Sequence, residues 1–277
     1  MSKRSNPKVT PKAKTKPKPK SRFMARGSIH DPEPLEPVVL ARHVICILHS
    51  DAKAIESAVA RFPAFSLDTE YSTSEPDPRM RKAFEASMDR VEASMTEADW
   101  TAVDQHTAVT YVFSPPIEPL RSRAISADAV RLCATALAAG AFAVKSESAG
   151  IAHGADRWRT LAAELEVEGR RDYALHSAFV RRPIAADDLE LYYTCGMHLL
   201  GRCDVEISKD LPALDALAWL DAFALYTLVE VSPDELRDGH TFRPDDESTR
   251  RRLQRYDCTR YPSDDFFYNP HGYWRLV

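Results

Sequence analysis

The sequence predicts an α+β fold with helices packed on a single central sheet, and a mixed-sheet α/β fold is the alternative. Strand-like and helix-like patterns alternate without strict β-α-β regularity and include a hairpin, which is typical of these classes. Hydrophobic residues make up 44% of the 277 residues, enough for a substantial core. We find no repeat and no long unpatterned gap after Arg42, so we expect one folded domain.

The domain is expected at 38–277, after a basic tail and an acidic, proline-rich linker at 1–37. Residues 1–26 carry ten Lys or Arg and no acid, alternating with proline and threonine, and this composition predicts disorder. Such a tail could contact nucleic acid or another anionic polymer weakly and nonspecifically. We favour a solubilising or spacer role for it.

Charge and cysteine content indicate a cytoplasmic protein with a basic partner. Residues 27–277 hold 27 bases and 41 acids, a net charge of −14, which repels nucleic acid and attracts cationic surfaces. The five cysteines form no C-x-x-C pair and lie in apolar segments, as expected of reduced thiols. The N-terminus lacks the apolar region of a secretory signal, and the run VVLARHVICIL is too short to span a membrane.

The first elements follow from short local patterns. The run 43–49 is apolar and β-branched, so it predicts a buried strand, and 51–61 predicts a helix capped by Ser50 or Asp51. Apolar residues then recur every three or four positions between 78 and 96, which predicts one amphipathic helix. These residues are Met80, Phe84, Met88, Val91 and Met95.

The central part of the chain alternates between strands and helices. We expect a strand at 107–113, a helix at 126–139 capped by Ser126, a hairpin formed by 142–146 and 150–153, and a helix at 154–166. The last of these places Trp158, Leu161 and Leu165 inward.

Two further strands are expected at 173–180 and 190–200, and a largely apolar, central helix at 214–228. A two-residue turn at 201–202 would pair position 200 with 203, 198 with 205 and 197 with 206.

The run 192–207 contains Cys195, His198, Cys203 and Glu206, all residue types that bind zinc. In extended backbone Cys195 and His198 project to opposite faces, so at most two of the four share a face. A structural zinc site needs four converging ligands. We therefore expect no metal here, and no cofactor elsewhere. A helical or loop conformation of this run would reverse that argument.

His153 is the best catalytic candidate, because it lies where a predicted strand enters a helix, a common place for ligands. Asp156 or Glu147 could orient it as a general base. We favour the alternative, in which Asp156 is a first-turn acid that complements the helix dipole and His153 is an exposed strand end. The sequence has no P-loop and no G-x-G-x-x-G, H-E-x-x-H or G-x-S-x-G motif.

Aromatic residues are dense in the last 22 positions, where arginines accompany them, a composition typical of binding hot spots. The candidate partner surface consists of Phe266, Tyr268, Tyr273 and Trp274. We favour slightly a structural role, in which this segment covers a sheet edge.

The segment TCGMHLLGRCDVEI resembles the pattern T-x-G-[LM]-x-x-[LF]-G-x-x-[DE]-aliphatic-E of an uncharacterised bacterial family, domain of unknown function 4261. The matching positions are Thr194, Gly196, Met197, Leu200, Gly201, Asp204, Val205 and Glu206. The order of elements around it, after Arg182-Pro183, is also similar. The resemblance implies an intracellular bacterial α+β protein, with some relatives encoded among secretion systems and polymorphic toxins, and it carries no catalytic residues.

Together these patterns favour a non-enzymatic interaction protein, such as an immunity or accessory protein that captures a basic partner. An enzyme acting on a small polar substrate at His153, and a nucleic-acid-binding protein using its tail, are the alternatives.

Overall fold

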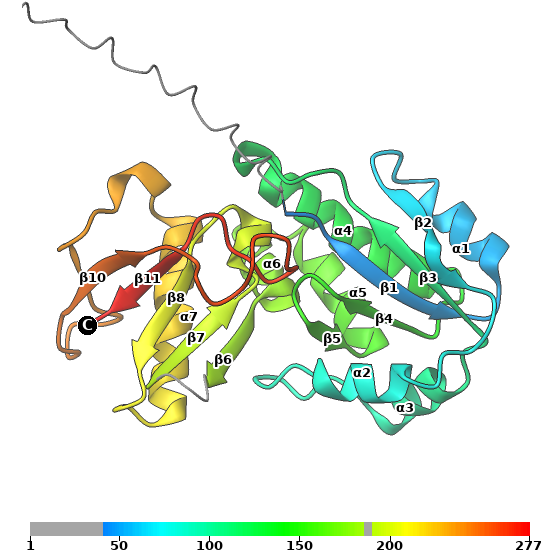
Figure 1. The fold of residues 1–277 in the computed structure, drawn as a ribbon, viewed down its shortest axis with the longest axis horizontal. Helices are drawn as coiled ribbons and strands as arrows, with labels where there is room; N and C mark the ends of the chain where they lie inside the picture. Colours follow the sequence, from blue (N-terminus) through cyan, green and yellow to red (C-terminus); the bar gives the residue numbers. More distant parts are fainter. Residues whose placement is uncertain (1–40, 186–189) are drawn as a thin grey trace, which may run out of the picture. The chain divides into compact units, whose positions relative to one another are not determined.

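The computed structural model describes residues 41–185 and 190–277, whose strands form two sheets (Figure 1). The predicted tail and linker at 1–37 lie outside these residues. The first sheet is antiparallel and contains, in spatial order, β2 (Ser66–Thr73), β3 (Ala108–Phe113), β1 (Val44–His49), β4 (Ala143–Ser146) and β5 (Ile151–His153). The α+β class is confirmed, whereas the expectation of one central sheet is wrong.

The second sheet is mixed, because β8 and β11 pair in parallel and its other neighbours are antiparallel. Its order is β6 (Arg181–Ala185), β7 (Leu191–Cys195), β8 (Asp204–Ser208), β11 (Tyr273–Leu276), β10 (Arg251–Tyr256) and β9 (Thr241–Phe242). The last two strands of the chain therefore extend a sheet that the preceding hairpin begins. The described residues belong to one compact unit, Val39–Val277.

The helices are α1 (Ala52–Val59), α2 (Met80–Ala86), α3 (Glu97–Asp104), α4 (Ser122–Ala138), α5 (Ala155–Glu164), α6 (Arg171–Phe179) and α7 (Ala213–Val229). Short 3-10 helices lie at η1 (Pro119–Arg121), η2 (Met197–Leu200) and η3 (Pro233–Glu235). Within the part of the chain that the structure describes, none of the helices combines the length and the apolar character that crossing a membrane requires.

Alternation along β1 places apolar residues on both faces of the first sheet. Ile45 and Ile47 pack in the main core with α1, α4 and α5, whereas Cys46 and Leu48 pack with α2 and α3 on the opposite face. All four are fully buried. Burying each of the larger side chains stabilises the fold by about 1.5–3 kcal/mol. Helices thus pack on both faces of the first sheet (Figure 1).

The second sheet is also covered on both faces. Val205, Ile207 and Leu276 belong to the main core, which includes buried residues of α7. On the other face Tyr193 and Tyr273 pack with side chains of the irregular segment 257–272, among them Tyr261 and Phe267. The C-terminal region therefore contributes two strands to the second sheet and covers one of its faces. The sequence pattern instead predicted that it would cover a sheet edge.

Several local predictions are confirmed. The strands β1 and β3, the β4–β5 hairpin and helices α1 and α5 lie where expected, and Trp158, Leu161 and Leu165 point inward. Asp51 caps α1, accepting a hydrogen bond from the Ala54 amide at 3.1 Å. Helix α4 begins at Ser122, four residues earlier than predicted. Ser126 is buried inside it and does not cap it.

The single helix predicted for 78–96 is wrong. Met80 and Phe84 are buried on α2 as the pattern requires, but the helix ends at Ala86, and Met88 forms a bridge with Ala152 of the first sheet. A second helix, α3, starts after Thr96, whose side chain forms a capping box with Asp99. The bridge between Met88 and Ala152 thus replaces the helix that the apolar periodicity predicts.

The strand predicted at 173–180 is also wrong, because this segment forms α6. Its buried apolar residues fall on a helical face: Ala174, Leu175, Ala178 and Phe179. The helix at 214–228 is confirmed, but its burial is one-sided, since Leu214 is 78% exposed while Leu220 and Phe223 are buried.

The strand predicted at 190–200 ends early, at Cys195, because Gly196 has φ +123°. Met197 to Leu200 then form η2, so the predicted two-residue turn and its pairing are wrong. Glu206, for example, pairs with Tyr193.

Gly196→Ala should destabilise the protein severely. A Cβ at this position would lie 1.9 Å from the Phe179 carbonyl oxygen, and the backbone angle is one that L residues rarely adopt. We expect a loss of more than about 3 kcal/mol in the free energy of unfolding, the upper end of the cost of such strain. Urea denaturation measures it.

Gly169→Ala is the matched control, since Gly169 has φ +73° and no atom within 4 Å of the added Cβ. It should lose only about 1–2 kcal/mol. Equal losses in the two variants would contradict a role for the contact with Phe179.

Candidate functional site

Two adjoining cavities form a groove over the face of the first sheet that α2 leaves uncovered. The larger is about 600 Å³ and the smaller about 250 Å³. They share the lining residues Val44, Phe113 and Phe266, so we treat them as one groove. The larger volume is within the range of pockets that hold small molecules or peptide side chains.

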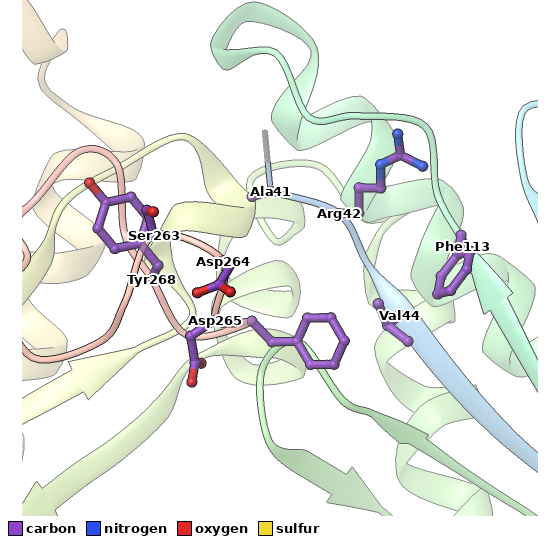
Figure 2. Close-up of a pocket in the computed structure, with 9 residues that line it drawn as sticks. Ala41, Arg42, Val44, Phe113, Ser263, Asp264, Asp265 and Tyr268 are labelled. Atoms are coloured by element: carbon purple, nitrogen blue, oxygen red, sulfur yellow. The ribbon is translucent and has the colours of Figure 1, made fainter. Parts of the chain in front are cut away.

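The walls of the groove come from segments far apart in the sequence. In the smaller cavity, Ser263, Asp264 and Asp265 of the C-terminal segment lie on the opposite side from Arg42 and Phe113 (Figure 2). In the larger cavity the opposite boundary is α2, which contributes Met80 and Ala83, together with Arg79 and with Tyr71 of β2.

Apolar side chains remain accessible in this groove. Phe266 is 55% exposed and Tyr71 is 68% exposed. Aromatic rings in such positions are suited to bury area against a ligand at a low entropic cost.

The larger cavity is lined by an ion pair between the buried Lys145 and the half-buried Glu147. Lys145 is 5% exposed, and its Nζ lies 2.9 Å from Glu147 Oε2 and 5.9 Å from the centre of the Phe84 ring. Tyr111 lies beside Cys46, its register partner on β1. Burial raises the pKa of the Cys46 thiol to about 12 and also raises the pKa of Tyr111, so both stay protonated at neutral pH.

Both cations that line the larger cavity are paired with acids, whereas the smaller cavity has acids in its wall. Arg79 pairs with Asp77 at 2.7 Å, and Lys145 with Glu147. Within residues 41–185 and 190–277, the exposed Asp264 forms no ion pair. The smaller cavity is therefore lined by two carboxylates, Asp264 and Asp265, and by one cation, Arg42.

The acidic wall is held in place by a buried carboxylate, Asp204. Its Oδ2 accepts from Asn269 Nδ2 at 2.6 Å, and its Oδ1 accepts from Thr194 Oγ1 at 2.8 Å and from the Met197 amide at 3.2 Å. Asn269 also donates to the Arg202 carbonyl at 3.0 Å. These bonds fasten the C-terminal segment to the β7–η2–β8 region.

Aromatic contacts complete this attachment. The hydroxyls of Tyr193 and Tyr261 are hydrogen bonded at 2.9 Å, and the Tyr261 and Phe267 rings meet edge to face at 5.6 Å. The Arg181 guanidinium lies 5.4 Å from the centre of the Phe267 ring. With Phe267 turned inward, its neighbour Phe266 faces the groove.

The residues considered for zinc are distributed as follows. Cys195 is buried in the tyrosine-rich cluster on the outer face of the second sheet, and Glu206 pairs with Arg260 at 2.6 Å and with Arg275 at 2.8 Å. His198 lies on η2, a conformation that the sequence argument did not assume, and burial lowers its pKa to about 4. Across the described residues no group of three His, Cys, Asp or Glu could hold a metal ion.

His153 does not meet the carboxylates proposed for it. It is buried, not exposed, and its Nδ1 lies 3.7 Å from Asp89 Oδ2, beyond hydrogen-bond distance. Burial lowers its pKa, although Asp89 opposes the shift. Asp156 is exposed and pairs with Arg159 at 2.7 Å, and Glu147 pairs with Lys145. Of these candidates only Glu147 lines the groove.

The aromatic candidates fall into two groups. Tyr273 and Trp274 are buried in β11, at 2% and 4% exposure, so their rings serve the core. Phe266 and Tyr268 line the smaller cavity. With Glu147, the sequence argument therefore found three groove residues, but it missed Phe113, Tyr71 and Arg79, which no motif marks.

Comparison of the chain with protein-family models, curated proteins and solved structures finds no significant match in any of the three. The resemblance to domain of unknown function 4261 stays a prediction. The local roles of its motif are nevertheless visible: Thr194 and Asp204 bond to each other, and Gly196 makes the sharp break before η2.

The stability of the protein should depend on pH through Asp204. Burial raises the pKa of this carboxyl to about 7, against the pull of hydrogen bonds from Asn269, Thr194 and Met197. Between about pH 4, the usual carboxyl pKa, and pH 7, the folded protein holds a proton that the unfolded chain releases. The contribution of this group to stability therefore falls as pH rises through that range.

Asp204→Asn removes this titration. We expect any stability advantage of the wild type over the variant to shrink between pH 5 and pH 8, as measured by thermal melts. Asp156→Asn, at a side chain that is 97% exposed, should differ from the wild type by a constant amount. A constant difference for Asp204→Asn as well would show that this carboxyl does not titrate in the range.

Proposed function

We propose that this protein binds a cationic segment of a partner protein in the groove between the first sheet, α2 and residues 263–268. The observation that carries the proposal is the exposed Phe266 ring in a groove wall that also contains Asp264 and Asp265. An apolar anchor beside unneutralised acids matches a segment that presents Lys or Arg next to an apolar side chain.

The charge of the whole chain supports the same partner. Residues 27–277 carry a net charge of −14, which accelerates the approach of a cationic surface. Lys145 and Arg79 each have an acidic partner of their own, so they do not cancel the acidic wall. Arg42 is the remaining cation at the groove, and it lies across the smaller cavity from Asp264 (Figure 2).

Within this proposal, an immunity or accessory role in a bacterial toxin or secretion system is the setting implied by the resemblance. A toxin that uses a cationic surface to reach nucleic acid or membranes would be a partner of the right charge. The enzyme alternative at His153 gains no support from the geometry of the described residues, since the Asp89 carboxylate is 3.7 Å from the imidazole, beyond hydrogen-bond distance. The nucleic-acid alternative rests on residues 1–26, outside the described part of the chain.

Asp264→Lys should weaken binding of a cationic peptide about tenfold, equivalent to about 1.4 kcal/mol. The probe is a fluorescein-labelled synthetic peptide of twelve residues that contains Lys, Arg and one central Phe, and fluorescence anisotropy measures its Kd. Reversing a charge in the groove wall replaces attraction by repulsion at the bound peptide. Phe266→Ala should also weaken binding, and its effect should be insensitive to salt.

Asp234→Lys is the matched control, because Asp234 is exposed and lies on η3, outside the groove lining, and the substitution changes the net charge equally. It should leave the Kd within about twofold, the modest effect of a distant, screened charge. Equal weakening by both charge reversals would mean that the peptide is attracted only by the net charge of the protein and not by the groove, which would contradict the proposal. Absence of measurable peptide binding would also overturn it.

A further inference from the structure

A separate, much smaller cavity lies on the other side of the Asp204 region. Its volume is about 60 Å³, and it is enclosed by the turn after η2, the end of α7, β10 and the loop before β11. Pockets for drug-sized ligands are about 300–1,000 Å³. The cavity therefore suits a ligand of a few atoms, or one end of a larger molecule.

The lining of this cavity is cationic. Arg202, Arg255 and His271 all contribute to it, and its lining contains no Asp or Glu. In the portion of the chain that the structure describes, neither arginine forms an ion pair. Burial lowers the pKa of His271, and Arg255 and Arg202 lower it further, which indicates a site of positive potential.

Both guanidinium groups are held in fixed positions. Arg202 donates from Nε to the Thr227 carbonyl at 2.7 Å and from Nη1 to the Gly201 carbonyl at 3.2 Å. Arg255 lies over the Trp274 ring at 5.1 Å and donates from Nη2 to the His271 carbonyl. Neutral carbonyls orient these groups without cancelling their charge, so N–H donors remain for another acceptor.

We propose that this cavity binds a small oxyanion, either inorganic phosphate or the phosphate end of a larger molecule. Arginine is the side chain best suited to phosphate, because its planar donors match two oxygens at once. An oxyanion would also offset the repulsion between two like charges that line the same small cavity.

Cys203 lines the same cavity, but it does not indicate phosphoryl transfer. Burial raises the pKa of its thiol to about 11, although Arg255 opposes the shift, so the nucleophilic thiolate is scarce at neutral pH. The arrangement fits recognition of an anion. The site shares no lining residue with the groove, so this proposal does not depend on the proposed function.

The test is a titration of the full chain with sodium phosphate at constant ionic strength, with sodium chloride as the balancing salt. Isothermal titration calorimetry and the melting temperature should both show saturable binding. Arg255→Gln should weaken the Kd at least tenfold. Arg251→Gln is the matched control, because Arg251 lies on the same strand over the Trp219 ring at 5.3 Å, outside the cavity lining, and it should leave the Kd within twofold.

Two further readouts sharpen the result. The imidazole signals of His271 in NMR spectra should shift along the same saturation curve, which locates the anion even if Arg255→Gln lowers stability. A second titration with O-phosphoserine distinguishes the two possible ligands. If it binds about as tightly as phosphate, the site accepts the phosphate end of a larger molecule. If only phosphate binds, the ligand is the free ion. No saturable effect of either compound, equal loss in Arg255→Gln and Arg251→Gln, or an unmoved His271 signal would overturn the proposal.

Discussion

The hydrogen bonds to the Asp204 carboxylate are the constraint on which the arrangement of both candidate sites depends. Asp204 begins β8, and its oxygens bind Thr194 at the end of β7, the Met197 amide in η2, and Asn269 in the C-terminal segment. A buried carboxylate without such donors would be costly, because burial disfavours its charged form. With them, three parts of the chain acquire a fixed relative position.

The two candidate sites lie on different sides of the hydrogen bonds to Asp204. Residues 263–268 precede Asn269 and form the acidic wall of the groove, whereas Arg202 and His271 lie next to the bonded residues and line the small cavity. Glu206, two residues after Asp204, meanwhile binds Arg260 and Arg275. Arg260 in turn lies over the Tyr193 ring at 3.8 Å. The arginines and aromatics of the C-terminus thus serve largely to fix the chain, and Phe266 is an exception because it stays exposed.

The elements that sequence reasoning predicted are those whose stability is decided locally. A β-branched run such as 44–49 fits a buried strand wherever it lies in the fold, and the Asp51 cap marks the start of α1 by itself. The helix predicted to continue after Ala86 does not form, because the Ser87 carbonyl accepts a hydrogen bond from the amide of Ala152, 65 residues away. Such long-range pairing overrides the helical periodicity of apolar residues. Gly196 was a local signal of a break in β7 that the alternating pattern obscured.

The groove was beyond sequence reasoning for a different reason. The groove residues come from five separate segments: Tyr71, Arg79, Phe113, Glu147 and Phe266. The packing of the first sheet and the attachment of the C-terminal segment through Asn269 together bring them close. The recognisable motif, in contrast, is local: Thr194 and Asp204 bond to each other, Gly196 makes a turn, and Glu206 holds two arginines. Its residues hold β7, η2, β8 and the C-terminal segment together. Proteins that share such a motif are therefore expected to share this local structure. Under the two proposals, ligand preference depends instead on exposed side chains such as Phe266 and Arg255, which lie outside the motif.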